Sequence, residues 1–219
     1  IMLAVPPTDN VHVHEDFASA ATVMPPELAA KWSDRETLRV NKPEGLLGLL
    51  PEKLSALMNH LLQGGQVTAA LGLAQSLLEV LPDPRPENEK QDKDEYSLSP
   101  EPCARFSAGR YKRILERMIP LLSPLARFPA FDLFCDLLEK VITLSKTSTD
   151  DEPGPEDYSY IWQPHLEDRP RGDDIKSILV HAAREVAGAI VMQDPTQLLT
   201  LVENLEKRRY EIFRRIALD

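Results

Sequence analysis

The residues of this chain that could bind a metal stand close together in the stretch VHVHEDF, Val11 to Phe17. His12 and His14 are two positions apart, and Glu15 follows them. Imidazole nitrogens and carboxylate oxygens are common ligands of zinc and related metals, so the cluster raises the hypothesis of a metal-dependent hydrolase. Residues two positions apart share a face only on a strand, however, and a hydrolytic site needs further ligands around it.

The other histidines add nothing to that hypothesis. His60, His165 and His181 stand in predicted helices or loops, and none belongs to an H-E-x-x-H pattern. We therefore expect the VHVHEDF stretch to be a polar, partly extended arm that leads into a helix from about Pro26 to Asp34. The metal-dependent hydrolase that uses His12, His14 and Glu15 is kept as an alternative.

Other catalytic patterns are missing from the sequence. It contains no G-x-S-x-G, no Walker glycine loop, no G-x-G-x-x-G and no C-x-x-C. The acidic stretch TDDEPGPED, Thr149 to Asp157, lacks the alternating ligands and central glycine of an EF-hand loop, so we interpret it as a solvated loop. The sequence therefore predicts a chain without enzymatic activity of its own and without a cofactor or metal.

Charge and composition exclude several classes of partner. The net charge of −10 repels nucleic-acid phosphates and anionic lipid, which argues against both as partners. No apolar run approaches the roughly 18 residues of a membrane span. The two cysteines, Cys103 and Cys135, are far apart, which is typical of a reducing compartment, and we expect a cytoplasmic location. Cys135 is predicted to be a core residue.

Leucine-rich stripes at helical spacing recur in pairs and predict an all-α protein. Pro51 fits the first turn of one helix, and the glycines of QGG end it. Pro195 fits the first turn of another, with Asp194 as its N-cap and Leu198, Val202 and Leu205 as its apolar stripe. Turns are expected at SPLARFP and QDP. The predicted helical hairpins span about 51–81, 108–146 and 173–206, and a further helix spans 208–219.

One helical hairpin cannot cover its own apolar stripes, so consecutive hairpins must stack. The sequence predicts an α-solenoid of the HEAT or armadillo kind over residues 46–219, preceded by an arm and capping-helix region at 1–45. Two long acidic insertions interrupt it. One is Pro82 to Glu101, with seven acidic and three basic residues, and the other is Thr147 to Gly172.

The C-terminal stretch RRYEIFRRIALD supports two expectations. Tyr210, Phe213 and Ile216 share one helical face with no stop signal after them, so we expect that face to await a further repeat that has been cut away. The basic residues around them leave nucleic-acid binding through this helix as a second alternative, against a solvated helix face as the simpler interpretation. These residues are Lys207, Arg208, Arg209, Arg214 and Arg215.

Aromatic side chains gather between two predicted helices, in YSYIWQPHLEDRPRGDD. Large apolar side chains there would anchor the loop, and loops on a rigid scaffold often carry binding residues. This loop is the predicted partner-binding surface. Its candidate residues are Tyr158, Tyr160, Trp162, His165, Arg169 and Arg171.

The run DIKSILVHAAREVAGAIVMQDPTQLLTLVENLEKRRYEIFRRIALD resembles the HEAT-like arrays of large bacterial proteins that carry an N-terminal P-loop NTPase module. PPELAAKW and the LLPEKL segment are similar to parts of the same arrays. The family's nucleotide-binding loop has no counterpart here. The resemblance implies a non-enzymatic scaffold or recognition segment of a larger cytoplasmic bacterial protein of the signalling or defence type. The expected partner is a protein or peptide with a basic patch, because the net charge attracts one.

Overall fold

A computed structural model describes most of the chain. The described part is 78% helical and 3% strand, which confirms the predicted all-α class. It comprises residues 10–36, 47–85, 100–145, 159 and 174–218.

Two compact units divide the chain, and each is assembled from two segments. The first unit takes Ile1–Glu79 and Arg105–Leu133, and the second takes Val80–Ala104 and Phe134–Asp219.

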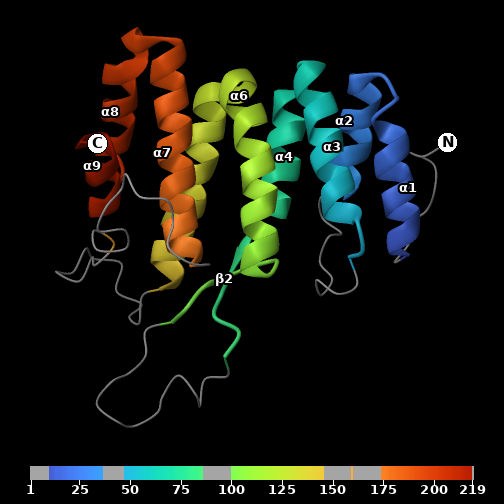
Figure 1. The fold of residues 1–219 in the computed structure, drawn as a ribbon, viewed down its shortest axis with the longest axis horizontal. Coiled ribbons are helices and arrows are strands. Elements are labelled where there is room, and N and C mark those ends of the chain that lie inside the picture. The colour runs from blue at the N-terminus through green and yellow to red at the C-terminus, as the bar shows by residue number, and fades with distance from the viewer. Residues whose placement is uncertain (1–9, 37–46, 86–99, 146–158, 160–173, 219) are drawn as a thin grey trace. The chain divides into compact units, whose positions relative to one another are not determined.

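Helices of the first unit pack in a regular alternating pattern. Figure 1 shows α1 to α4 side by side. α1 packs against α3 and α2 against α4, while each helix also contacts the one next to it along the chain. The cores of these helices meet through side chains such as Leu57, Met58 and Leu73, which have no exposed surface. The bounds are α1 Val11–Ala21, α2 Pro26–Glu36, α3 Leu50–Gln63 and α4 Val67–Leu77.

The VHVHEDF stretch is the first turns of α1, so the prediction of an extended arm there was wrong. Asn10 is the N-cap, and its side-chain oxygen accepts a hydrogen bond from the His12 N–H at 3.0 Å. Asn is among the strongest N-cap residues. Ala18 and Ala21, which lie further along the helix, are fully buried. The alternation of valine and histidine imitated a strand, whereas the cap and the small buried residues favour a helix. The helix predicted from Pro26 is confirmed as α2.

The turn between α3 and α4 forms where the sequence predicted it. Pro51 lies in the first turn of α3, and the helix ends at Gly64. Gly65 has a φ of +74°, a conformation that glycine adopts without cost. The N–H of Gln66 donates to the Leu61 carbonyl at 2.8 Å and the N–H of Gly65 to the Leu62 carbonyl at 3.1 Å, which is a Schellman motif.

The predicted turn at SPLARFP is a break in the helical run α6, Ala108–Leu144. Arg127 has φ 41° and ψ −116° there, and it is the one non-glycine residue with a positive φ in the described ranges. These angles are close to the first central position of a type II′ turn, which glycine dominates. Pro129 follows the break and fits the first turn of the next helical segment.

Tyr111, earlier in α6, is fully buried and donates its hydroxyl to the Leu78 carbonyl at 3.1 Å.

We expect Arg127→Gly to stabilise the protein. A non-glycine residue in such a conformation costs on the order of 1–3 kcal/mol, while the extra freedom of glycine in the unfolded chain costs about 0.4–1 kcal/mol. The net gain should be about 0.5–2 kcal/mol, measured by chemical denaturation. Arg127→Ala is the control, since it removes the same exposed guanidinium and keeps the strain. Equal stability of both variants would mean that the backbone at this position is relaxed.

Length and composition alone would allow one helix of the described residues, Ala108–Leu144, to cross a membrane. Half of its most apolar 18-residue window is buried inside the protein. A core helix passes the same test, so this is weak evidence for a membrane span.

The second unit contains the end of α6, a two-stranded ladder and three further helices with a short 3₁₀ turn. β1 (Val80–Leu81) pairs antiparallel with β2 (Cys103–Ala104), with Val80 opposite Ala104. α8 packs against both the 3₁₀ turn η5 and α9. The remaining bounds are α7 Ile175–Gln193, η5 Pro195–Gln197, α8 Leu198–Glu206 and α9 Glu211–Leu218.

The cap predicted at Asp194 is confirmed. Its carboxylate accepts the Thr196 N–H at 3.1 Å, and Pro195 occupies the first turn that follows. Asp174 caps α7 in the same way, by accepting from the N–H groups of Lys176 and Ser177.

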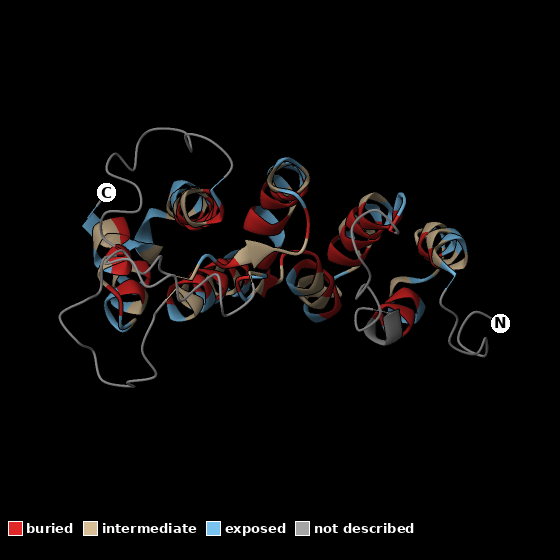
Figure 2. Ribbon diagram, turned by 90° about the horizontal axis from the view of Figure 1, so that it is seen from below, coloured by how far each residue is buried: buried red, intermediate tan, exposed pale blue. Residues whose placement is uncertain are grey.

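The apolar face of the C-terminal helix is covered. Tyr210 is 8% exposed, Phe213 0% and Ile216 6%, all within the second unit. The expectation that this face is left open was therefore wrong, because α9 packs against α8. The further repeat itself stays a prediction. Figure 2 shows the general rule that each helix carries its buried residues along one side and its exposed residues along the other.

Candidate functional site

The histidines of the proposed metal cluster diverge. On α1 their two-residue spacing sends them to different sides, because only residues three or four apart share a helical face. His12 is exposed and its Nδ1 lies 3.2 Å from Glu15 Oε2, whereas His14 is buried. Glu15 Oε1 accepts the Leu49 N–H at 2.6 Å, at the start of α3. That hydrogen bond lowers the pKa of Glu15 below its ordinary value.

The described contacts of Glu15 are therefore structural, because its carboxylate joins α1 to the start of α3. Within the described residues, no three His, Cys, Asp or Glu side chains come close enough together to hold a metal ion. The metal-dependent hydrolase alternative thus has no ligand set in this part of the chain.

The basic residues of the C-terminal stretch are engaged with their own unit. Arg208 Nη1 lies 2.8 Å from Asp136 Oδ1 and 3.3 Å from Glu139 Oε1, and its guanidinium stands 5.4 Å from the centre of the Phe213 ring. Burial opposes the charge of Arg208, but Cys135 and the two carboxylates hold its pKa above the ordinary value. Arg214 pairs with Glu211 one turn away. Arg208 and Arg214 are thus already paired with carboxylates.

The predicted partner-binding loop falls almost wholly outside the described residues. Tyr158, Tyr160, Trp162, His165, Arg169 and Arg171 all lie there. Ser159 is the one described residue between them. It is buried, and its Oγ accepts the Ile212 N–H at 3.4 Å, close to the start of α9. The role of this loop in binding stays a prediction.

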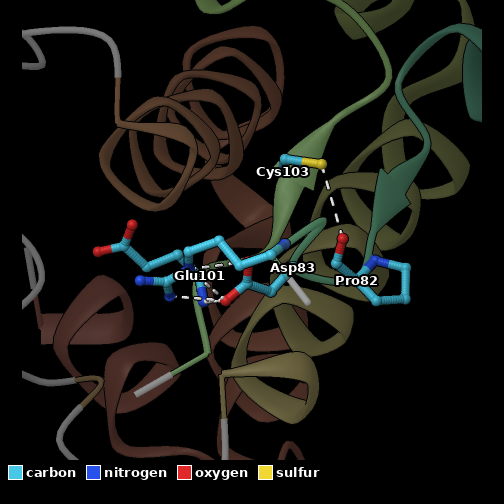
Figure 3. A network of polar contacts seen from close by, with 5 residues as sticks. Pro82, Asp83, Glu101 and Cys103 are labelled. Atoms are coloured by element: carbon cyan, nitrogen blue, oxygen red, sulfur yellow. Dashed lines mark hydrogen bonds and ion pairs between the residues drawn. The ribbon is translucent and has the colours of Figure 1, made fainter. Parts of the chain in front are cut away.

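A buried carboxylate joins the two chain segments that lead away from the β1–β2 ladder (Figure 3). Asp83 accepts hydrogen bonds from the Arg85 N–H at 2.9 Å and from Arg85 Nη2 at 2.6 Å. It also accepts the Glu101 N–H at 3.0 Å, across 18 positions of sequence. The Asp83 side chain is 2% exposed. A buried carboxylate with these partners is typical of a structural role. Asp83 holds the two ends of the first acidic insertion together.

We expect Asp83→Asn to lower the melting temperature at neutral pH and to have a smaller effect in acid. The hydrogen bonds from Arg85 and then from Glu101 hold the pKa of Asp83 well below its usual range. Its contribution to stability is therefore complete above the pKa of an unfolded aspartate, about 3.9, and is lost as the pH falls toward the lower folded value. Melting curves of both proteins from neutral pH to about pH 3 measure this. A difference that stays constant would contradict the assignment.

The cysteines have no sign of catalytic activation. Cys135 is fully buried, as predicted from the sequence. Cys103 is half-buried with its Sγ 3.7 Å from the Pro82 carbonyl, and burial, followed by the charge of Asp83, raises its pKa. A raised pKa keeps the thiol protonated and unreactive.

The feature of the described surface that most resembles a binding site is apolar. Of the eight large hydrophobic residues that are exposed in the described ranges, three flank the turn between α7 and α8. Met192 is 87% exposed, Leu198 49% and Leu199 74%. We call these three residues the α7–α8 tip. Exposed apolar side chains that cluster, and methionine in particular, are enriched where proteins bind one another.

The sequence predicted Leu205 correctly on the apolar stripe of α8, but it placed two other residues there wrongly. Leu198, Val202 and Leu205 were predicted to face the core, but the structure buries Leu201 and Leu205 and leaves Leu198 and Val202 partly exposed. The helix has leucine or valine at five of its nine positions, so several registers fit a helical period. The signal that could have identified the tip was this excess of apolar residues beside a polar turn.

Comparison with known proteins adds no relative. No protein-family model matches the chain, and no curated protein or solved structure matches it at a significant level.

Proposed function

We propose that this chain is a non-enzymatic helical-repeat scaffold that binds a partner protein or peptide. The observation that carries the proposal is the packing of α1 on α3 and of α2 on α4 in the first unit. Hairpins that stack with like helix on like helix are the building principle of α-solenoids, whose extended surfaces bind other proteins. The HEAT-like solenoid with two acidic insertions is part of this proposal.

The second unit supplies an exposed apolar surface at the α7–α8 tip for such a partner. The predicted loop residues between Tyr158 and Arg171 are a further candidate contact. The resemblance to the repeat arrays of bacterial P-loop NTPases supports the proposal that the chain acts as a recognition segment of a larger cytoplasmic protein. The net charge of −10 favours a partner with a basic patch.

Nucleic acid is a weaker candidate partner. The ion pairs of Arg208 with Asp136 and Glu139 reduce the charge that the C-terminal stretch offers to phosphates. A gel-shift titration at two salt concentrations tests this alternative. Tight binding with a steep salt dependence, weakened by Arg208→Ala with Arg215→Ala, would replace the protein partner with a nucleic acid.

The direct test is affinity capture from cells that express the protein, followed by reconstitution from purified components. We expect one captured protein to form a binary complex in calorimetry, with binding weakened by Met192→Ser combined with Leu199→Ser. The matched control is Val23→Ser, which removes an 85% exposed apolar side chain from the first unit. The proposal fails if no captured protein binds once purified, or if the chain chemically converts what it binds.

A further inference from the structure

The outward face of α8 combines an apolar end with an acidic end. Leu199, Val202, Glu203 and Glu206 are spaced i, i+3, i+4 and i+7, so they share one side of the helix. Leu199 is 74% exposed, Val202 is half-buried and both glutamates are exposed. The opposite side of the helix buries Leu201 and Leu205. An ordinary surface helix would carry polar residues along its whole outward side.

The charges of this face are uncompensated in the described structure. The carboxylates of Glu203 and Glu206 make no ion pair or hydrogen bond with another described residue, whereas Asp194, at the turn itself, is fully used as a helix cap. Lys207 stands at the flank of the face and forms no ion pair with them in the described part of the chain. The face therefore offers an apolar contact followed, one to two turns later, by negative charge.

We propose that this face, with the α7–α8 tip, is a docking site for an amphipathic helix that carries Lys or Arg beside its apolar stripe. The inference rests on the proposed function, and it names the chemistry of the partner. Apolar residues of that helix would cover Met192, Leu198 and Leu199, and its basic residues would pair with Glu203 and Glu206. Helices bound in this way contact their partners through residues spaced three and four apart.

Charge selects this occupant over two others. In a two-fold contact between copies of this chain, Glu203 and Glu206 would stand near their own counterparts, and two bodies of net charge −10 would repel. An anionic membrane surface would be repelled by the same carboxylates. A basic helix is attracted by them, and apolar contact at the tip then holds it.

The test uses fluorescent model helices of about 18 residues, five helical turns, with identical leucine stripes. One carries lysine on its polar positions, one glutamate and one glutamine, and binding is followed by anisotropy. We expect the lysine peptide to bind tightest. Leu199→Ser and the double variant Glu203→Lys, Glu206→Lys should each weaken it at least about fivefold. The double variant should also gain affinity for the glutamate peptide, because a specific charge pair can be reversed.

Matched controls separate this face from the overall field of the protein. Asp16→Lys with Glu116→Lys changes two exposed carboxylates of the first unit and alters the net charge by the same amount. Val23→Ser removes an exposed apolar side chain elsewhere. Both controls should leave the lysine peptide's affinity within about twofold, well short of the factor of ten that 1.4 kcal/mol represents. Equal weakening by tip and control variants would overturn the proposal.

Two further measurements identify a wrong occupant. Dimerisation detected by light scattering and lost in Leu199→Ser, or sedimentation with phosphatidylcholine–phosphatidylserine vesicles lost in the same variant, would assign the face to a second copy or to a membrane. A captured partner whose binding is unchanged by Leu199→Ser and by the charge reversals would contradict this docking site but not the proposed scaffold function. If no captured protein binds the purified chain, the proposed scaffold function itself is contradicted.

Discussion

Trp32→Ala should lower the free energy of unfolding by about 3–5 kcal/mol, the range for removal of a large aromatic side chain from a core. Trp32 is 1% exposed and lies in α2 of the first unit. Its ring stands edge-on to Phe17 of α1, with 6.4 Å between ring centres and an angle of 87°. The indole therefore joins the two helices of the first hairpin, and no smaller side chain fills the same volume. Denaturant titration followed by far-ultraviolet circular dichroism measures the loss.

Trp32→Phe is the matched variant, and it should lose much less. Phenylalanine keeps an aromatic ring for Phe17, and it removes an indole N–H that has no hydrogen-bond partner within the described residues. A buried donor without a partner costs about 1–3 kcal/mol, so its removal offsets part of the lost volume. Val23→Ala, at an 85% exposed position, should change stability by less than about 0.5 kcal/mol. A loss below about 1 kcal/mol for Trp32→Ala would place the indole outside the core.

Local chemistry explains why most helices were predictable. Pro51, the glycines after Gln63, and the pair Asp194 and Pro195 are signals that act within one turn, and the structure has a helix boundary at each of them. The turn at SPLARFP is also local, because the stretch contains two prolines, Pro124 and Pro129, which disfavour one uninterrupted helix through it. These features depend only on residues that are close together in the sequence, so one sequence is enough to predict them.

Tertiary contacts explain what the sequence did not predict. Asp83 and Glu101 are 18 positions apart, and only the folded second unit brings them together. The α1 helix is stabilised in part by Glu15, which caps α3 through Leu49 at a separation of 34 positions. Sequence periodicity does not reveal such long-range pairs. The alternation of valine and histidine was therefore interpreted as an extended arm rather than as a helix.

The candidate site shows a further limit of periodicity. A stripe of leucines predicts that a helix is amphipathic, but not which of two overlapping stripes is buried. In α8 the structure buries Leu201 and leaves Leu198 49% exposed, a choice that the leucine pattern alone leaves open. The exposed residues of the α7–α8 tip could therefore be identified only from the folded unit.

Gly64→Ala should destabilise the first unit, although its backbone conformation suits any residue. Gly64 has a φ of −84°, so no strain follows from the substitution itself. A methyl group there would lie 2.3 Å from both Cβ and Cγ of Pro26, at the start of α2. A proline ring cannot rotate away, so the α3–α4 turn would have to move from α2. Overpacking of this kind costs about 1–3 kcal/mol, measured by denaturant titration.

Gly72→Ala provides the opposite expectation in the neighbouring helix. A Cβ at Gly72 would meet nothing within 4 Å, so the substitution should stabilise α4 by up to about 1 kcal/mol through helix propensity. The two glycines thus differ in whether a facing side chain occupies the space of the added methyl group. Pro26→Gly removes both clashing carbons. The double variant Gly64→Ala, Pro26→Gly should therefore lose less stability than the sum of the losses of the two single variants. Additive losses, or a Gly64→Ala variant as stable as the wild type, would contradict the close approach of the α3–α4 turn to Pro26. Either result would also contradict the packing of the first two hairpins, on which the scaffold proposal depends.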